Sequence, residues 1–358
     1  MKPIDIEVMK EIVLQTHEVG IFHEYGEAGS LALRTLLENL PKLYEYINPE
    51  VIKNSFIVFR HVAPRDIPES LSKPTRFTNL AYLAAHCDVQ RSTSTTIIQI
   101  YDSNEFHVWK GVYIEASELA QNAIVYTFSK GKEYIITAKK SYELQNPSPL
   151  HASVFAIPTY RTLEEALDHY KYNSIKTSRC PIFSEAWEGG NAGNRLYFQK
   201  KPEEHMRKSL QYYLQNVLRD AYVHPEINVD ESHPVDIQVI WELTNRAAII
   251  EIKWLGKSMS DSGEFLSYSD SRARAGAKQL AEYLDAKRTW DPMHETIGYL
   301  VVIDARRNGL KPSSTTIDET NGLWYKDKEI QFVPEYHKSR SDFAEPIRMF
   351  AEPKCSPS

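Results

Sequence analysis

The sequence predicts a mixed α/β protein of two domains, an α+β domain over residues 1–185 and an α/β domain over residues 195–358. The chain has 358 residues, which is enough for two ordinary domains. Short segments rich in β-branched and aromatic residues crowd the first half, whereas helical and strand patterns alternate in the second. A stretch rich in glycine and asparagine, residues 185–194, separates the two patterns and indicates their connection.

The N-terminal domain is predicted to begin with a long helix and to continue as a sheet. Helical spacing runs from Ile4 to Leu40, with a break between Gly20 and Gly29, and Pro41 is expected to end the helix. The succession of strand patterns indicates a meander, and a short helix is expected at residues 162–172. The predicted strands are residues 55–62, 95–101, 105–114, 123–128 and 134–138.

The C-terminal domain is predicted to contain a helix, a β-hairpin, a second helix and a strand. Pro202 stands near the start of a strong helical pattern over residues 202–219. Residues 236–243 and 247–254 are predicted as paired strands, with Thr244 and Asn245 in the turn between them. A helix over residues 271–287 and a buried strand over residues 297–304 then complete a β-α-β unit.

Composition indicates a soluble globular protein of the cytoplasm. Hydrophobic residues make up 42% of the chain and charged residues 25%, and no apolar run is long enough to span a membrane. The first residues lack the pattern of a signal peptide, and the three cysteines fit neither a zinc site nor a disulfide framework. The net charge of -6 argues against a protein that coats nucleic acid by bulk charge, but it leaves room for a local basic groove.

Two acidic residues and a lysine are expected to converge in the predicted hairpin. A turn centred on Thr244 and Asn245 places Asp236 opposite Lys253, with Glu251 diagonal to Asp236, at roughly 5–8 Å. Because side chains alternate along a strand, Glu251 and Lys253 share a face. Two carboxylates form a hard-oxygen site suited to Mg²⁺ or Mn²⁺. Such an ion can polarise a phosphoryl oxygen and help generate hydroxide near neutral pH, and a neighbouring lysine can orient the attacking water.

These residues resemble the motif of the PD-(D/E)xK nuclease superfamily, whose members have the restriction-endonuclease-like fold. The motif consists of a Pro-Asp pair, a spacer, and Glu or Asp followed by any residue and Lys. It is matched by Pro234-Val235-Asp236, with one residue inserted, and by Glu251-Ile252-Lys253. The resemblance covers about residues 200–305 and implies a mixed sheet flanked by helices. Residues 1–185 resemble no family, so their role is open between sensing, regulation and nucleic-acid binding.

Two flanking features add to the resemblance. Members often carry a glutamate on the helix before the hairpin, and Glu203 is favoured over Glu204 because it shares the inward-facing apolar stripe. Many members also carry a Gln-x-x-x-Tyr element on the helix after the lysine strand, which Gln279 and Tyr283 match. The i, i+4 spacing places these two on one helix face, where the resemblance implies that they support the site or contact the DNA backbone.

The resemblance implies a nuclease that hydrolyses DNA phosphodiester bonds with Mg²⁺ or Mn²⁺. Asp236 and Glu251 would bind the ion together with the backbone carbonyl of Ile252. Glu203 would complete the ligand set directly or through water, and Lys253 would position the attacking water. Because two sites can cut both strands, the resemblance also suggests a homodimer. A nuclease joined to an unrelated domain resembles bacterial defence or restriction effectors, whose extra domain senses a signal or a protein partner.

Less specific interpretations remain open at this point. The acidic residues and lysine of the hairpin fit an ordinary solvated ion pair, the helix glutamate fits a complement to the helix N-terminus, and the Gln-x-x-x-Tyr pair fits plain packing. Arg272 and Arg274 fit a solvated helix face as well as phosphate contact, and Arg306 and Arg307 are expected in a surface loop. The alternative function is a catalytically inactive module that keeps the nuclease fold and binds nucleic acid or a protein.

Overall fold

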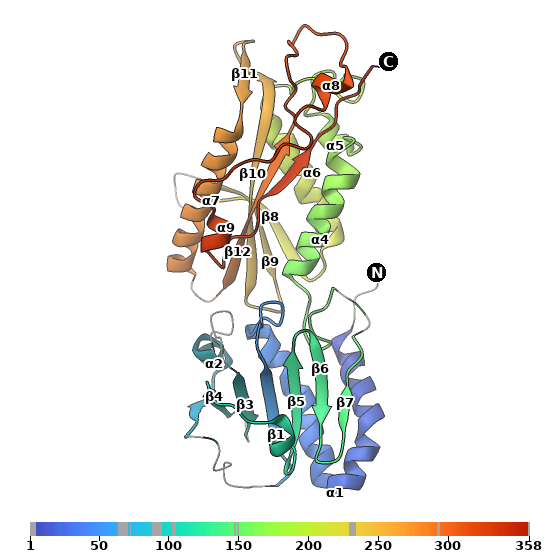
Figure 1. Ribbon diagram of the computed structural model, residues 1–358, viewed down its shortest axis with the longest axis vertical. Coiled ribbons are helices and arrows are strands. Elements are labelled where there is room, and N and C mark those ends of the chain that lie inside the picture. Colours follow the sequence, from blue (N-terminus) through green and yellow to red (C-terminus); the bar gives the residue numbers. More distant parts are fainter. Residues whose placement is uncertain are drawn as a thin grey trace. The chain divides into compact units, whose positions relative to one another are not determined.

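The chain folds into two compact units, Met1–Arg161 and Thr162–Ser358, each built on a mixed sheet (Figure 1). The computed structural model describes residues 5–63, 71, 73–87, 95–101, 105–146, 148, 150–228, 234–291 and 294–356. The α/β class predicted from the sequence is thereby confirmed. The division falls earlier than the expected connection, since residues 185–194 belong to the second unit. There Trp187 is buried and stacks on Phe198, with 4.2 Å between ring centroids.

The N-terminal unit packs a long helix on a sheet whose described strands follow the order β2-β4-β3-β1-β5-β6-β7. The expected meander is only partly correct, because β1 lies between the β3–β4 hairpin and the β5–β6–β7 meander and runs parallel to β3. Its first four residues are fully buried, which suits a central position in a sheet. The strands are β1 (Phe56–His61), β2 (Thr75–Phe77), β3 (Thr96–Ile100), β4 (Phe106–Lys110), β5 (Ala123–Ser129), β6 (Lys132–Ile136) and β7 (Ser141–Glu143).

Helix α1 (Ile6–Tyr46) covers this sheet, and α2 (Leu80–Cys87) and α3 (Ala116–Leu119) are short. The expected break is confirmed at Gly26, whose φ of 66° bends the helix. The expected end at Pro41 is wrong, because the helix continues through the proline. Leu43 and Tyr44 are buried beyond it, and their packing outweighs the backbone hydrogen bond that a proline removes. Ile4, where the helical pattern begins, lies outside the described residues.

The C-terminal unit carries the candidate site on a sheet with the order β13-β12-β10-β9-β8, to which β11 adds by pairing with β10. Figure 1 shows α7 on one side of this sheet and α6 on the other. The helices are α4 (Tyr160–Tyr170), the π-helix η1 (Lys171–Ile175), α5 (Pro181–Ser184), α6 (Pro202–Val217), α7 (Asp270–Trp290), α8 (Glu319–Gly322) and α9 (Tyr336–Ser339). The strands are β8 (Ala221–Asn228), β9 (Pro234–Trp241), β10 (Arg246–Met259), β11 (Phe265–Tyr268), β12 (Glu295–Asp304) and β13 (Ile347–Phe350).

The predicted hairpin and β-α-β unit are both present. Strand β10 pairs antiparallel with β9 and parallel with β12, and α7 crosses between the two parallel strands. The register differs from the prediction, because Ile250 pairs with Ile237 and one further step places Asp236 opposite Glu251 rather than Lys253. The turn is centred one residue earlier than expected. A one-residue shift of the turn moves the register by two residues, so every side chain keeps its face of the sheet.

None of the helices in the described part of the chain combines the length and the apolar composition needed to cross a bilayer. The three cysteines, Cys87, Cys180 and Cys355, are free.

Candidate functional site

The acidic and basic residues of β10 lie in the interior of the C-terminal unit. Glu251 is only 1% exposed, and its Oε1 accepts a hydrogen bond from the Nζ of Lys253. Because β10 has a neighbouring strand on each side and α7 over this face, the pair is shielded from water. The interpretation as a solvated ion pair on an exposed hairpin face is therefore wrong. A buried carboxylate is retained at a free-energy cost that partners must offset.

The second oxygen of Glu251 lacks such a partner. Its Oε2 is buried and has no hydrogen-bond partner among the described residues. The pKa of Glu251 is raised to about 7, chiefly by burial and then by the neighbouring Asp236 carboxylate, against the lowering effect of Lys253. An unsatisfied buried acceptor costs about 1–3 kcal/mol, and more when it is charged. A cation bound at this oxygen would remove that cost.

Asp236 approaches the same place from β9. Its Oδ2 accepts the backbone N–H of Ile252 at 2.8 Å, and its Oδ1 lies 3.7 Å from the NH1 of Arg207 on α6. Burial raises the pKa of Asp236, whereas the Ile252 hydrogen bond and the positive charges of Lys253 and Arg207 lower it. The N–H and C=O of one strand residue point to the same edge, so the carbonyl of Ile252 also faces Asp236. Of Pro234, the first residue of the motif, only the backbone is described.

Glu203 lies near these carboxylates but is engaged elsewhere. It stands in the first turn of α6, and its Oε1 accepts hydrogen bonds from the Nε1 of Trp254, at 3.2 Å, and from Arg272. Its negative charge raises the pKa of both Asp236 and Glu251. No complete set of three or more His, Cys, Asp or Glu ligands is assembled in the described residues. The oxygens that fit a hard cation are thus those of two carboxylates and one backbone carbonyl, with Glu203 close by.

Gln279 and Tyr283 are joined to each other, since the Nε2 of Gln279 donates a hydrogen bond to the Tyr283 hydroxyl. Both follow Gly276 at spacings of three and seven residues, which places them on the same face of α7. Gly276 lies directly on Lys253, because a Cβ at this glycine would be 2.5 Å from the Cγ of the lysine. The helix therefore presents this face to β10.

The direction of α7 shows where along β10 its residues lie. A helix that connects two parallel strands runs antiparallel to them, so its later turns lie toward the start of β10. Leu280 accordingly contacts Gly298, which pairs with Ile249, two residues before Glu251. Gln279 lies on α7 between Leu280, which is level with Ile249, and Gly276, which is level with Lys253. This intermediate position along β10 is that of Glu251.

Two residues of the site escaped the sequence interpretation, Arg207 and Gly276. Arg207 follows Glu203 by four residues on α6, and this spacing on one helix face is the signal that could have revealed it. Gly276 is an isolated glycine within a strong helical pattern, which commonly marks close packing.

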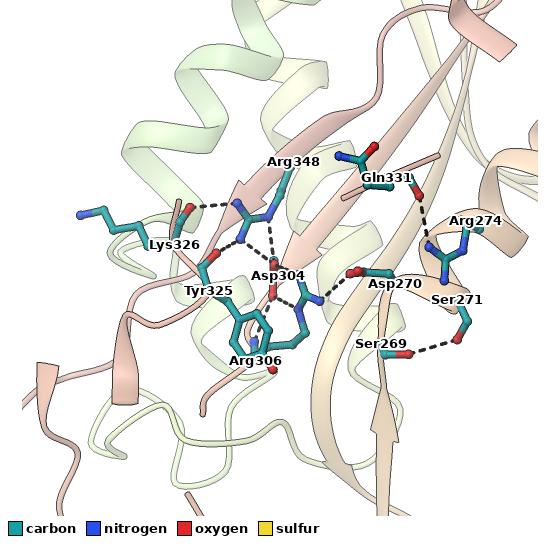
Figure 2. A network of polar contacts seen from close by, with 10 residues as sticks. All are labelled: Ser269, Asp270, Ser271, Arg274, Asp304, Arg306, Tyr325, Lys326, Gln331 and Arg348. Atoms are coloured by element: carbon teal, nitrogen blue, oxygen red, sulfur yellow. Dashed lines mark hydrogen bonds and ion pairs between the residues drawn. The ribbon is translucent and has the colours of Figure 1, made fainter. Parts of the chain in front are cut away.

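A network of ion pairs fixes the start of α7 (Figure 2). Asp304 is fully buried at the end of β12, and its carboxylate accepts hydrogen bonds from Arg306 and from Arg348 on β13, the latter at 2.9 Å. Arg306 also pairs with Asp270, the first residue of α7, and its guanidinium lies 4.5 Å from the ring centroid of Tyr325. The network therefore ties the beginning of α7 to the end of the neighbouring strand.

The surface loop expected for Arg306 and Arg307 is thus contradicted, because both side chains are partly buried and bonded. Arg307 donates hydrogen bonds to the carbonyls of Arg195 and Ala351, and burial lowers its pKa to about 10. Both arginines serve to join chain segments.

Comparison of the chain with protein-family models, curated proteins and solved structures found no match. Its function is therefore argued from the chemistry of the residues described above.

Proposed function

We propose that the C-terminal unit is a metal-dependent nuclease that hydrolyses DNA phosphodiester bonds, with a restriction-endonuclease-like arrangement of its sheet and helices. The observation that carries the proposal is the buried Oε2 of Glu251, which has no hydrogen-bond partner in the described part of the chain and lies in a site with Asp236 and Lys253. A purely structural carboxylate would have its acceptors satisfied by protein donors.

The donor set favours a hard divalent cation. Carboxylate and carbonyl oxygens suit Mg²⁺ or Mn²⁺, and these are the groups that Asp236, Glu251 and Ile252 supply. Asp236, Glu251 and the carbonyl of Ile252 would hold the ion, with Glu203 as a further oxygen ligand. When bound, the ion polarises a phosphoryl oxygen and lowers the pKa of a coordinated water.

The remaining residues of the chain have positioning roles in this proposal. Lys253 carries a positive charge at the carboxylates and can donate hydrogen bonds to the oxygen of the attacking water or to a phosphate oxygen. Gly276 leaves room for the lysine stem beneath α7. Gln279 and Tyr283 form one hydrogen-bonded unit at the level of Glu251 and would support the site or contact the DNA backbone.

The proposal is tested by incubating the full-length protein with Mg²⁺ or Mn²⁺ and with supercoiled plasmid, linear duplex, single-stranded DNA and RNA. Cleavage of DNA is expected, with losses of about 100-fold or more in Glu251→Gln and Lys253→Met. A matched control is the exposed pair Lys278 and Glu282 on α7, whose side chains are 72% and 65% exposed. The variants Glu282→Gln and Lys278→Met make the same changes of charge and should cleave as the wild type does.

Undiminished cleavage by folded Glu251→Gln and Lys253→Met would disprove the assignment. A wild type that binds DNA but cuts no substrate would instead establish the alternative, a non-catalytic binding module. DNA as the substrate, a homodimer, a cytoplasmic defence or restriction role, and sensing by the N-terminal unit come from the resemblance and belong to the same proposal.

A further inference from the structure

Each acidic side chain of the candidate site is paired with one basic side chain. The positive groups that a phosphate would need and the negative groups that a cation would need therefore neutralise one another. We call these three contacts the site ion pairs. They are Glu251 with Lys253, Asp236 with Arg207 at 3.7 Å, and Glu203 with Arg272.

Among the basic members, Arg272 is held in the most defined position. Its guanidinium lies 3.9 Å from the ring centroid of Tyr268 and 5.6 Å from that of Trp254, so aromatic rings fix its orientation. The side chain remains 25% exposed, and its Nε is a buried donor without a hydrogen-bond partner in the described residues. A guanidinium that is fixed in place, accessible and not fully bonded is suited to bind a phosphate through parallel N–H groups.

The backbone position of Arg272 is fixed as well. Asp270 precedes it by two residues and is paired with Arg306, which is itself bonded to the buried Asp304 (Figure 2). Arg274 provides a contrast, because it is exposed and donates a single hydrogen bond, at 3.2 Å, to the carbonyl of Gln331. Of these two arginines, Arg272 is the one that pairs with a carboxylate of the candidate site.

We propose that Arg272 is a phosphate-binding residue that is paired with Glu203 when no ligand is bound. DNA and a divalent cation would then each favour the binding of the other. The inference rests on the proposed nuclease function and adds a coupling between its two ligands. When a phosphate binds Arg272, Glu203 loses its cationic partner, and the three carboxylates of Glu203, Asp236 and Glu251 repel one another. A bound divalent cation relieves this repulsion. A cation bound by Glu203 conversely releases Arg272 for the phosphate. Thermodynamic linkage makes the two effects equal in magnitude.

The first test measures DNA binding in a chelator, where no cleavage can occur. Fluorescence anisotropy of a short labelled duplex is expected to show binding about fivefold to tenfold tighter in Glu203→Gln than in wild type. The control is Glu204→Gln in the same helical turn, since Glu204 is 52% exposed and paired with Lys208 at 2.7 Å. This control should change affinity by less than about twofold. In the double variant Glu203→Gln/Arg272→Gln the gain should disappear.

The second test measures the binding of Mn²⁺ alone, without DNA. Because Arg272 competes with the ion for Glu203, Arg272→Gln should tighten Mn²⁺ binding severalfold, and Arg274→Gln should do so much less. Equal effects of Glu203→Gln and Glu204→Gln on DNA binding, or of Arg272→Gln and Arg274→Gln on Mn²⁺ binding, would overturn the inference. If the wild type still cleaves DNA in that case, the nuclease proposal stands. A wild type that binds neither DNA nor Mn²⁺ would overturn both proposals.

Discussion

Two buried glutamates, one in each unit, differ in how their oxygens are satisfied. Glu133 of β6 and Glu251 of β10 are each 1% exposed. Both oxygens of Glu133 are occupied, because Oε1 accepts the hydroxyls of Tyr126 and Ser153, each at 2.6 Å, and Oε2 accepts the N–H of Val154 at 2.8 Å. Glu251 has Lys253 on one oxygen and no hydrogen-bond partner in the described residues on the other.

This comparison teaches that burial alone does not distinguish a carboxylate with a structural role from one that we propose binds a cation. Glu133 lies within a closed network that extends through Tyr126 to the hydroxyl of Tyr44, at 2.7 Å. Such a network contributes to stability and has no capacity for another ligand. The arrangement around Glu251 leaves one carboxylate oxygen available as an acceptor, and the fold tolerates the free-energy cost of burying that oxygen without a hydrogen bond.

The largest expected effect comes from removing each carboxylate in turn. Glu133→Ala leaves two hydroxyls and an amide without their acceptor, so it should lower the free energy of unfolding by about 3–5 kcal/mol. Glu251→Ala removes a group that was itself incompletely paired, and the Asp236 carboxylate still compensates the charge of Lys253, so we expect a change below about 1.5 kcal/mol. Urea unfolding followed by circular dichroism measures both values, and hydrogen exchange identifies the unit affected. A loss of stability as large in Glu251→Ala as in Glu133→Ala would break the comparison.

The pH dependence of stability should sharpen the comparison of Glu251 with Glu133. Burial raises the pKa of Glu251 to about 7 in the fold, above the ordinary value of 4.5. The stability linked to its protonation is present below the ordinary pKa and is lost as pH rises through the folded pKa. In a chelator, the free energy of unfolding should therefore decline between about pH 5 and pH 8, and Glu251→Gln should reduce this decline. Superimposable pH profiles of the two proteins would contradict the proposed burial of the charge.

A smaller effect is expected at Gly276. In Gly276→Ala the new Cβ would press on the Cγ and Cε of Lys253, at 2.5 and 3.0 Å, and displace the lysine. Alanine favours a helix over glycine by about 1 kcal/mol, so stability should hold while cleavage falls about tenfold. The control Gly298→Ala presses on Leu280 and Leu284 instead, so it should lower stability more than activity. If folded Gly276→Ala and folded Gly298→Ala lost activity equally, the position of Lys253 would not limit the rate of cleavage.

The sequence predicted those parts of the fold that depend on local pattern. The hairpin, the β-α-β unit and the convergence of Asp236, Glu251 and Lys253 all follow from alternation along neighbouring strands. The position of β1 did not follow, because its pairing with β3 joins segments far apart in the chain. The contact of Glu203 with Arg272 was also out of reach, since it depends on where α6 and α7 meet around the sheet.

The carboxylate at the end of β12 has a consequence for any shortening of the protein. Asp304 depends on Arg348, which stands in the last strand, near the end of the chain. A truncation that removed Arg348 would leave the buried Asp304 carboxylate with Arg306 as its remaining partner. It would also weaken the ion pairs that fix the start of α7. The final strand is therefore needed for the fold, and we expect a C-terminal affinity tag to be tolerated when it is placed after this strand.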